Sequence, residues 1–109
     1  MVNKIKKIKT VILGCGEVAG LKNKSTGSFL NHASEIQKNK HFDLVCNIER
    51  NKFKREKFKS IYNISQSFKS INEFLISKIK SDLIVICTNA KSHYLNLTQL
   101  IKNNFKNIL

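Results

Sequence analysis

The sequence predicts an α/β protein with a parallel sheet covered by helices on both faces, and three observations carry this prediction. Short apolar runs recur along the chain, each followed by a segment with helical periodicity. The first of these runs breaks into a glycine-rich turn. The most apolar run, residues 83–88, is continuous rather than alternating, as in a strand buried on both faces. Strands that alternate with helices in this way imply right-handed crossovers within one parallel sheet.

The N-terminal part of the chain predicts a strand, a loop, a helix and a second strand. Residues 6–13 alternate and then become apolar, as a central parallel strand should. The polar, glycine-containing stretch 21–28 predicts a loop, and helical periodicity runs over residues 29–40. The apolar face of that helix consists of Phe29, Ala33 and Ile36. Residues 41–48, apolar in their middle, predict the second strand.

The middle of the chain predicts a basic helix followed by an edge strand. The helix is expected over residues 49–59, with Phe53 and Phe58 as its inward contacts. Residues 61–68 are polar and β-branched in patches, which is typical of a short third strand at the edge of a sheet.

The C-terminal part predicts two more helices, the fourth strand and the start of a fifth. Residues 70–73 form a capping box that opens a helix over residues 71–80. This helix should bury Ile71, Phe74, Leu75 and Ile79. After the strand at 83–88, the last helix has an apolar stripe made of Tyr94, Leu97, Leu100, Ile101 and Phe105. With residues 107–109 as the beginning of a fifth strand, the expected order is βαβαβαβαβ.

Length and composition predict one soluble domain spanning residues 1–109. No apolar run approaches the roughly 20 residues that a membrane-spanning helix needs, so we expect no membrane contact. Four lysines before an apolar stretch ending in Cys15 imitate a lipoprotein signal. The stretch is shorter than the ~7 to 15 apolar residues of a secretory core, and Glu17 follows at once. We therefore expect a cytoplasmic protein.

The three cysteines, Cys15, Cys46 and Cys87, are far apart and each lies in or beside an apolar run. There is no Cys-x-x-Cys pair, and no histidine is close enough in sequence to complete a metal site. We interpret the cysteines as small buried apolar residues and expect no metal.

The formal net charge of +13 raises the question of a nucleic-acid partner. The lysines are scattered over nearly every segment, without an arginine cluster or an aromatic stacking platform. This distribution favours a basic solvated surface, helped by an anionic cofactor or substrate, and we expect no specific nucleic acid. A basic nucleic-acid-binding module stays open as an alternative.

The glycine-rich turn after the first strand is suited to a phosphate group. Gly14 permits a tight turn, Gly16 lets backbone approach a pyrophosphate, and the small Ala19 allows close packing of helix on strand. A pyrophosphate would meet the amides of the helix N-terminus. The pattern indicates a dinucleotide-binding fold of the Rossmann type, in which the sheet and two helical layers form a three-layer sandwich.

Three loops should meet at the carboxyl ends of the strands, where such sheets bind ligands: residues 14–20, 47–50 and 88–93. An NAD enzyme normally places a carboxylate after the second strand, and here that position is Asn47. Asn47 can bond a ribose hydroxyl or merely begin a turn, and Glu49 could supply the acid. Arg50 and Lys52 could instead accept a 2′-phosphate, so NAD and NADP both stay open.

Three segments resemble the N-terminal domain of the Gfo/Idh/MocA oxidoreductases, from the first strand to the last residue. Residues 14–19, Gly-Cys-Gly-Glu-Val-Ala, are similar to that family's Gly-x-Gly-x-x-Ala loop. Residues 44–49 resemble its second strand. Residues 86–93 resemble its Thr-Pro-x-x-x-His segment, with Asn89 in place of the proline.

The resemblance implies a nucleotide-binding domain of an NAD- or NADP-dependent dehydrogenase acting on a sugar or polyol. Thr88 and Asn89 would line the cofactor, and His93 would open a helix beneath the nicotinamide; we assign no catalytic role to His93. The expected cofactor-binding residues are Gly14, Cys15, Gly16, Glu17, Val18, Ala19, Asn47, Glu49, Arg50, Thr88, Asn89 and His93.

In this family the fifth strand continues into a Glu-Lys-Pro motif with a catalytic lysine, followed by a substrate domain. The sequence stops at Leu109 before both, so we expect an incomplete catalyst whose partners are a dinucleotide and a missing C-terminal domain or a second copy. A non-catalytic sensor domain that binds NAD or NADP is the other alternative.

Replacing Gly16 by valine should abolish dinucleotide binding and leave the fold largely intact, because a side chain would occupy the place of the pyrophosphate. Nicotinamide fluorescence measures the binding, and far-UV circular dichroism controls for the fold. Retained affinity in a folded variant would refute the placement of the loop.

Overall fold

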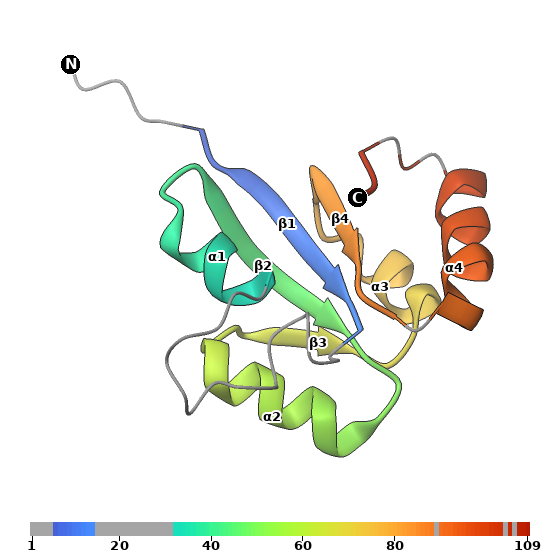
Figure 1. The fold of residues 1–109 in the computed structure, drawn as a ribbon, viewed down its shortest axis with the longest axis horizontal. Coiled ribbons are helices and arrows are strands. Elements are labelled where there is room, and N and C mark those ends of the chain that lie inside the picture. Colours follow the sequence, from blue (N-terminus) through green and yellow to red (C-terminus); the bar gives the residue numbers. More distant parts are fainter. Residues whose placement is uncertain (1–5, 15–31, 89, 104, 106) are drawn as a thin grey trace.

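The computed structural model describes residues 6–14, 32–88, 90–103, 105 and 107–109 of the 109-residue chain. Within these residues, strands and helices alternate along the chain (Figure 1). The elements are β1 (Ile8–Leu13), α1 (His32–Lys38), β2 (Phe42–Ile48), α2 (Lys52–Tyr62), β3 (Gln66–Phe68), α3 (Ile71–Ser77), β4 (Leu83–Ile86) and α4 (Ala90–Lys102). The predicted α/β class is confirmed.

The described strands form one four-stranded parallel sheet in the order β3-β2-β1-β4, with β1 and β2 in the interior. The expectation that the third strand lies at an edge is confirmed. Beyond β4, Ile108 makes an isolated parallel bridge to Ile84. The predicted start of a fifth strand is therefore present as a short extension of the sheet on the β4 side.

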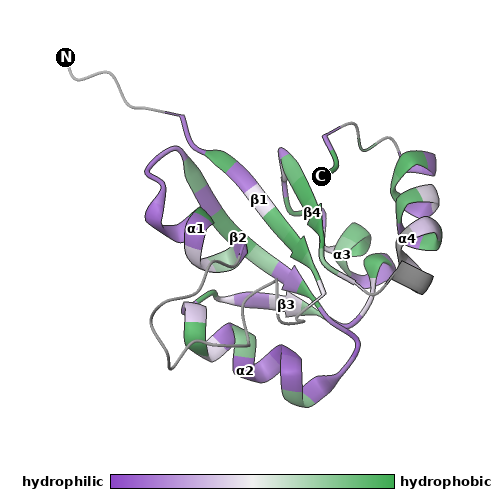
Figure 2. Cartoon of the chain, in the orientation of Figure 1, coloured by the Kyte–Doolittle hydropathy of each residue, from purple (hydrophilic) through white to green (hydrophobic). Residues whose placement is uncertain are grey.

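Both faces of the sheet are buried, because β1 sends alternate side chains to opposite sides. Ile12 packs in one apolar cluster with residues of α1 and α2, such as Ala33 and Phe58. Val11 and Leu13 pack in a second cluster with residues of α3 and α4, such as Phe74. Figure 2 shows the apolar colouring of β4 and of the carboxyl-terminal half of β1, and the hydrophilic colouring of much of α2. The predicted helical layers on both faces are confirmed.

Helix α2 begins three residues later than predicted, because Asn51 caps it. The Asn51 side chain accepts a hydrogen bond from the Lys54 backbone N–H at 3.0 Å, as N-cap residues do. Helix α2 continues to Tyr62, so the predicted start of the third strand at residue 61 is wrong. In this helical phase Phe58 is fully buried, as predicted, and Phe53 is 75% exposed, contrary to prediction.

The capping box before α3 is confirmed with one difference. The Glu73 backbone N–H donates to Ser70 Oγ at 3.1 Å, and the Glu73 carboxylate accepts from the Lys69 N–H rather than from that of Ser70. Ile71 and Phe74 are buried, and Leu75 and Ile79 pack against the same cluster. Helix α3 ends at Ser77 rather than Lys80, because Lys78 adopts the left-handed conformation that ends helices.

The predicted apolar stripe of α4 is wrong in three of its members. Leu100 is buried and Phe105 packs against the core, but Tyr94 (73%), Leu97 (39%) and Ile101 (58%) are exposed. Among the α4 side chains that the structure describes, the half-buried ones are polar instead: Ser92, Asn96, Thr98 and Gln99. Helix α4 is thus rotated so that a polar face, rather than its most apolar one, points into the protein.

Gly14 is required at the end of β1 for two reasons. Its φ of +103° lies in the region that side chains rarely adopt, and a Cβ added there would lie 2.8 Å from the Cys87 carbonyl oxygen. The backbone of the segment after β4 therefore passes directly over this position.

Replacing Gly14 by alanine should lower the free energy of unfolding by about 1–3 kcal/mol, the cost of a residue held in such a backbone conformation. Urea unfolding followed by circular dichroism measures the change. The matched control is Lys78→Gly, which relieves a positive φ of 56° at an exposed site and should cost little. A Gly14→Ala variant as stable as the unmodified protein would contradict the strain.

Candidate functional site

The carboxyl ends of β1, β2 and β4 are joined by backbone hydrogen bonds just beyond the regular strands. The Gly14 N–H donates to the Ile48 carbonyl at 2.7 Å, and the Cys87 N–H donates to the Leu13 carbonyl at 2.7 Å. Two of the three loops predicted to share a pocket, those after β2 and β4, are thereby fixed to the end of β1.

Asn47 adds side-chain hydrogen bonds to this junction, the point where the ends of β1, β2 and β4 are joined. It is fully buried, and its Nδ2 donates to the carbonyl oxygens of Ile12 at 3.1 Å and Gly14 at 3.0 Å. The amide therefore bonds to backbone at the end of β1, and Asn47 is not among the residues that line the neighbouring cavity. Bonding to the backbone of the neighbouring strand is a third role for Asn47, besides the predicted hydrogen bond to a ribose hydroxyl and the predicted start of a turn.

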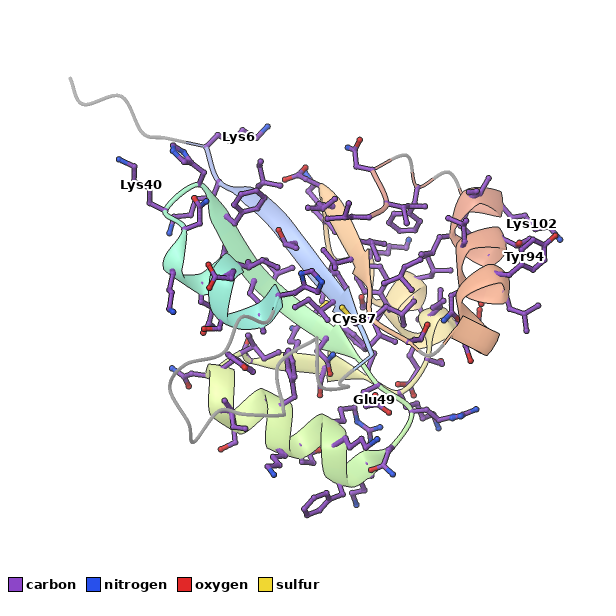
Figure 3. The ribbon with its side chains drawn as sticks, in the orientation of Figure 1. Lys6, Lys40, Glu49, Cys87, Tyr94 and Lys102 are labelled. Carbon is purple, nitrogen blue, oxygen red and sulfur yellow. The ribbon has the colours of Figure 1, made fainter. Side chains whose placement is uncertain are left out.

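A cavity of about 710 Å³ lies above the junction, and we call it the strand-end cavity. Four of the predicted site residues line it: Gly14 from the end of β1, Glu49 and Arg50 from the loop after β2, and Thr88 from the loop after β4. Figure 3 shows Glu49 and Cys87, another lining residue, at this end of the sheet. Its location agrees with the rule that parallel α/β sheets bind ligands beyond the carboxyl ends of their strands.

Hydrogen bonds fix the loop between β2 and α2. The Glu49 N–H donates to the Phe68 carbonyl at 2.8 Å, and Glu49 Oε2 accepts from the Asn51 N–H at 2.8 Å. The carboxylate of Glu49 is half-buried at the cavity, and the side chain of Arg50 is exposed beside it. An acidic and a basic group thus stand side by side where β2 ends.

The polar face of α4 forms the opposite wall of the strand-end cavity. Asn96 Nδ2 donates to Thr88 Oγ1 at 3.0 Å, which orients the threonine hydroxyl. Ser92 and Gln99 line the cavity beside Asn96. We did not predict these three residues, although their spacing at positions 92, 96 and 99 places polar groups on one helical face.

The charge of the cavity is suited to an anion. Among the described residues that line it, Arg50, Lys54 and Lys69 carry positive charge and Glu49 carries negative charge. Lys69 also pairs with Glu73 at 3.7 Å. Of the two residues predicted to accept a 2′-phosphate, Arg50 lines the cavity, while Lys54 lines it in place of Lys52.

The remaining predicted site residues lie wholly or partly outside what the structure describes. Cys15, Gly16, Glu17, Val18, Ala19 and Asn89 are outside the described residues. His93 falls in the first turns of α4, and only its backbone is described.

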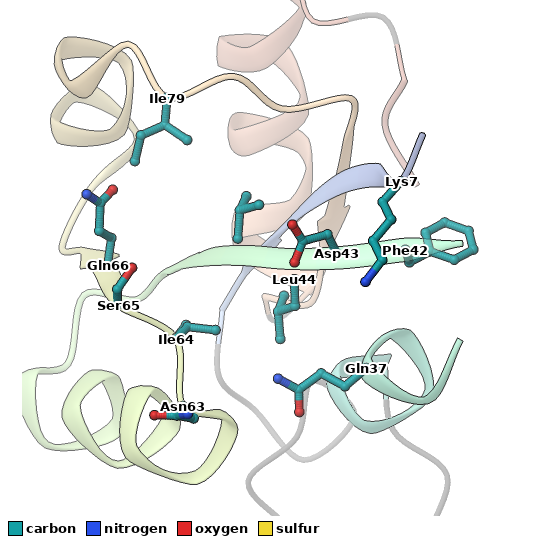
Figure 4. Close-up of a pocket in the computed structure, with 11 residues that line it drawn as sticks. Lys7, Gln37, Phe42, Asp43, Leu44, Asn63, Ile64, Ser65, Gln66 and Ile79 are labelled. Carbon is teal, nitrogen blue, oxygen red and sulfur yellow. The ribbon is translucent and has the colours of Figure 1, made fainter. Parts of the chain in front are cut away.

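A second cavity, of about 750 Å³, lies at the opposite end of the sheet (Figure 4). It is lined by residues at the amino ends of β2 and β3, among them Phe42, Asp43 and Gln66, and by Lys7 and Gln37. None of the predicted site residues lines it. Because ligands of parallel α/β sheets bind at the other end of the strands, we do not assign the site here.

The described residues hold neither a cluster of metal ligands nor a membrane-spanning helix. They contain no group of three His, Cys, Asp or Glu side chains that could hold a metal ion. None of the helices they form has the length and apolar character required to cross a bilayer.

Burial makes Cys46 and Cys87 poor nucleophiles. Removal from water raises the pKa of the Cys46 thiol from 9.0 to about 12 and that of the Cys87 thiol from 9.0 to about 11. Both thiols are neutral at physiological pH, and thiolate is the reactive form of cysteine. Cys87 therefore contributes an apolar surface to the strand-end cavity, in line with the interpretation of these cysteines as buried apolar residues.

The parallel sheet, the glycine at the end of β1 and the cavity above it define a dinucleotide-binding domain of the Rossmann type. The sequence model of the Gfo/Idh/MocA family, described as an oxidoreductase family with an NAD-binding Rossmann fold, matches residues 8–109. The chain belongs to this family and is an NAD-binding oxidoreductase domain. The resemblance seen in the sequence is confirmed.

Solved structures with the same fold include three dehydrogenases or oxidoreductases. The WlbA dehydrogenase from Bordetella pertussis, in complex with NADH and UDP-GlcNAcA, is 17% identical with a TM-score of 0.74, over 94% of this chain and 26% of that one. An oxidoreductase from Agrobacterium radiobacter, in complex with NAD+, L-tartaric acid and magnesium, is 13% identical with a TM-score of 0.72, over 94% and 27%. Apo scyllo-inositol dehydrogenase from Lactobacillus casei is 16% identical with a TM-score of 0.69, over 97% and 28%.

This chain spans about a quarter of the length of each of these structures. A search among curated proteins gave no match. The structural likeness therefore carries the fold, and the family match carries the cofactor class.

Alkaline pH should destabilise the protein through Cys46. In the unfolded chain this thiol ionises near pH 9.0, whereas in the folded chain it stays protonated to about pH 12. The unfolded state then binds fewer protons, so the free energy of unfolding falls as pH rises above 9, by at most about 1.4 kcal/mol per pH unit for one thiol.

The test compares urea unfolding of the unmodified protein and Cys46→Ala at pH 7.5, 9 and 10.5 under reducing conditions. The two proteins should have parallel pH dependence below pH 9 and diverge above it, with the steeper fall in the unmodified protein. An identical fall in both would show that the thiol ionises equally in the folded and unfolded chains.

Proposed function

We propose that this chain is the cofactor domain of a sugar or polyol dehydrogenase and that it binds NAD or NADP in the strand-end cavity. The observation that carries the proposal is the convergence of Gly14, Glu49 and Thr88, from the ends of three strands, on that one cavity. The adenosine ribose would lie against Glu49, since a carboxylate after the second strand bonds the ribose hydroxyls in such folds. Arg50, Lys54 and Lys69 would attract the phosphates.

The remaining predicted residues take their roles from the family pattern. In this proposal the backbone of the loop at residues 14–19 cradles the pyrophosphate, with Gly14, Cys15, Gly16, Glu17, Val18 and Ala19 contributing. Thr88 and Asn89 line the cofactor, and His93 lies beneath the nicotinamide. Asn47 does not line the cavity in this proposal. It holds the ends of β1 and β2 together through the two hydrogen bonds of its Nδ2.

The proposed substrate class comes from the solved structures that share this fold. The structural relatives include a dehydrogenase in complex with UDP-GlcNAcA and two inositol dehydrogenases. Hydride transfer requires the substrate carbon and the nicotinamide to be held together, and we propose that a substrate domain or a second copy of the chain completes the site. When bound, the nicotinamide supplies the hydride chemistry; these residues bind and orient it.

Cofactor binding is tested by titrating the 109-residue chain with NADH and NADPH and following nicotinamide fluorescence. At least one of the two should give saturable binding. No change with either nucleotide at millimolar concentration would overturn the proposal.

The site is tested with Thr88→Val, which removes the hydroxyl that lines the cavity. Affinity should fall by about five- to tenfold, the worth of about one hydrogen bond. The matched control is Thr98→Val in the following helix α4, because Thr98 Oγ1 donates to the Tyr94 carbonyl at 2.9 Å and does not line the cavity. Equal affinity in the two variants would place the cofactor elsewhere.

A further inference from the structure

Arg55 bonds to the loop between β2 and α2, which contributes Glu49 and Arg50 to the strand-end cavity. Its Nη1 donates to the carbonyl oxygens of Glu49 at 2.8 Å and Arg50 at 3.4 Å. Arg55 is half-buried in the first turns of α2 and does not itself line the cavity. One guanidinium nitrogen therefore holds two consecutive carbonyl groups of the loop that carries the predicted ribose-binding acid.

These bonds complete the fixation of the loop. The N–H groups of Glu49 and Asn51 are held by the Phe68 carbonyl and by Glu49 Oε2, both at 2.8 Å. The Asn51 side chain caps α2 through the Lys54 N–H at 3.0 Å. Arg55 donates to the carbonyl oxygens of Glu49 and Arg50 in the same loop. With both sides held, the peptide between Glu49 and Arg50 cannot rotate freely, and the directions of both side chains are set.

A guanidinium is well suited to this task. It stays charged at all physiological pH values and its donors lie in a rigid plane, whereas lysine presents a flexible point charge. Hydrogen bonds from a charged donor are also stronger than those between neutral groups. The loop is thus ordered before any ligand arrives, which lowers the entropy cost of binding.

We infer that Arg55 is a positioning residue for the adenosine end of the cofactor, acting through Glu49 without touching the ligand. This inference rests on the proposed cofactor site. It assigns to α2, which also contributes Lys54 to the cavity lining, a specific part in recognising the ribose. Loss of the two bonds should let the Glu49–Arg50 peptide turn and should weaken ligands that reach Glu49.

The first experiment compares Arg55→Met, which keeps the apolar stem and removes the donors, with Lys57→Met, an exposed basic position on the same helix. The probes are NADH, 5′-AMP and reduced nicotinamide mononucleotide, which has no adenosine. Arg55→Met should weaken NADH and 5′-AMP on the order of five- to tenfold and leave the mononucleotide unchanged. Lys57→Met should change none of the three, and Arg55→Lys should recover part of the loss.

The mononucleotide distinguishes positioning from a general loss of structure, because a loosened fold would weaken all three probes equally. If the unmodified chain binds neither NADH nor NADPH, the proposed function fails. If it binds NADH and Arg55→Met binds NADH and 5′-AMP equally well, this inference alone is overturned.

The second experiment is a double-mutant cycle with Glu49→Ala. If Arg55 acts through Glu49, Arg55→Met should have little further effect on NADH affinity once the carboxylate is absent. Full additivity of the two losses would overturn the assignment, since it would show that Arg55 contributes independently of Glu49.

Discussion

The structure depends on the junction at which β1 ends between its two neighbours. The Gly14 N–H donates to Ile48, the last residue of β2, and Leu13 accepts from Cys87, just after β4. The buried Asn47 amide donates to both Ile12 and Gly14. The close passage of the Cys87 carbonyl leaves no room for a side chain at Gly14. Because Gly14 has no side chain, the backbone after β4 can pass close to the end of β1, and the loops after β2 and β4 line one cavity.

The order of elements was predictable because apolar periodicity is a local property. Parallel strands buried on both faces are nearly continuous in apolar residues, and helices repeat every 3.6 residues. The capping box at Ser70 depends only on residues close together in the sequence, so the sequence predicts it. By contrast, the start of α2 depends on Asn51, whose suitability as a cap competes with the helical pattern of its neighbours. Phe53 and Phe58 are five residues apart, about 140° around a helix, so burial of Phe58 leaves Phe53 facing outward.

The rotation of α4 could not be read from its apolar pattern, because a second requirement overrides it. The helix contributes Leu100 to the core, but Asn96 and Ser92 face the strand-end cavity. Local sequence rules fail most often where a functional site imposes its own demands. At Asn47, for which the sequence left a ribose hydrogen bond and the start of a turn both open, the structure shows an amide that donates to the backbone at the end of the neighbouring strand.

Helices α2 and α4 are buried to different extents, which affects how readily each opens by local fluctuation. Helix α2 places both Phe58 and Tyr62 in the core, whereas among the α4 side chains that the structure describes, Leu100 alone is buried. Local opening costs least where the fewest apolar contacts are lost, so amide hydrogens of α4 exchange with solvent through smaller fluctuations than those of α2. Such an opening would break the hydrogen bond from Asn96 to Thr88 at the wall of the strand-end cavity, while the strand pairing of β1 with β2 and β4 stays in place.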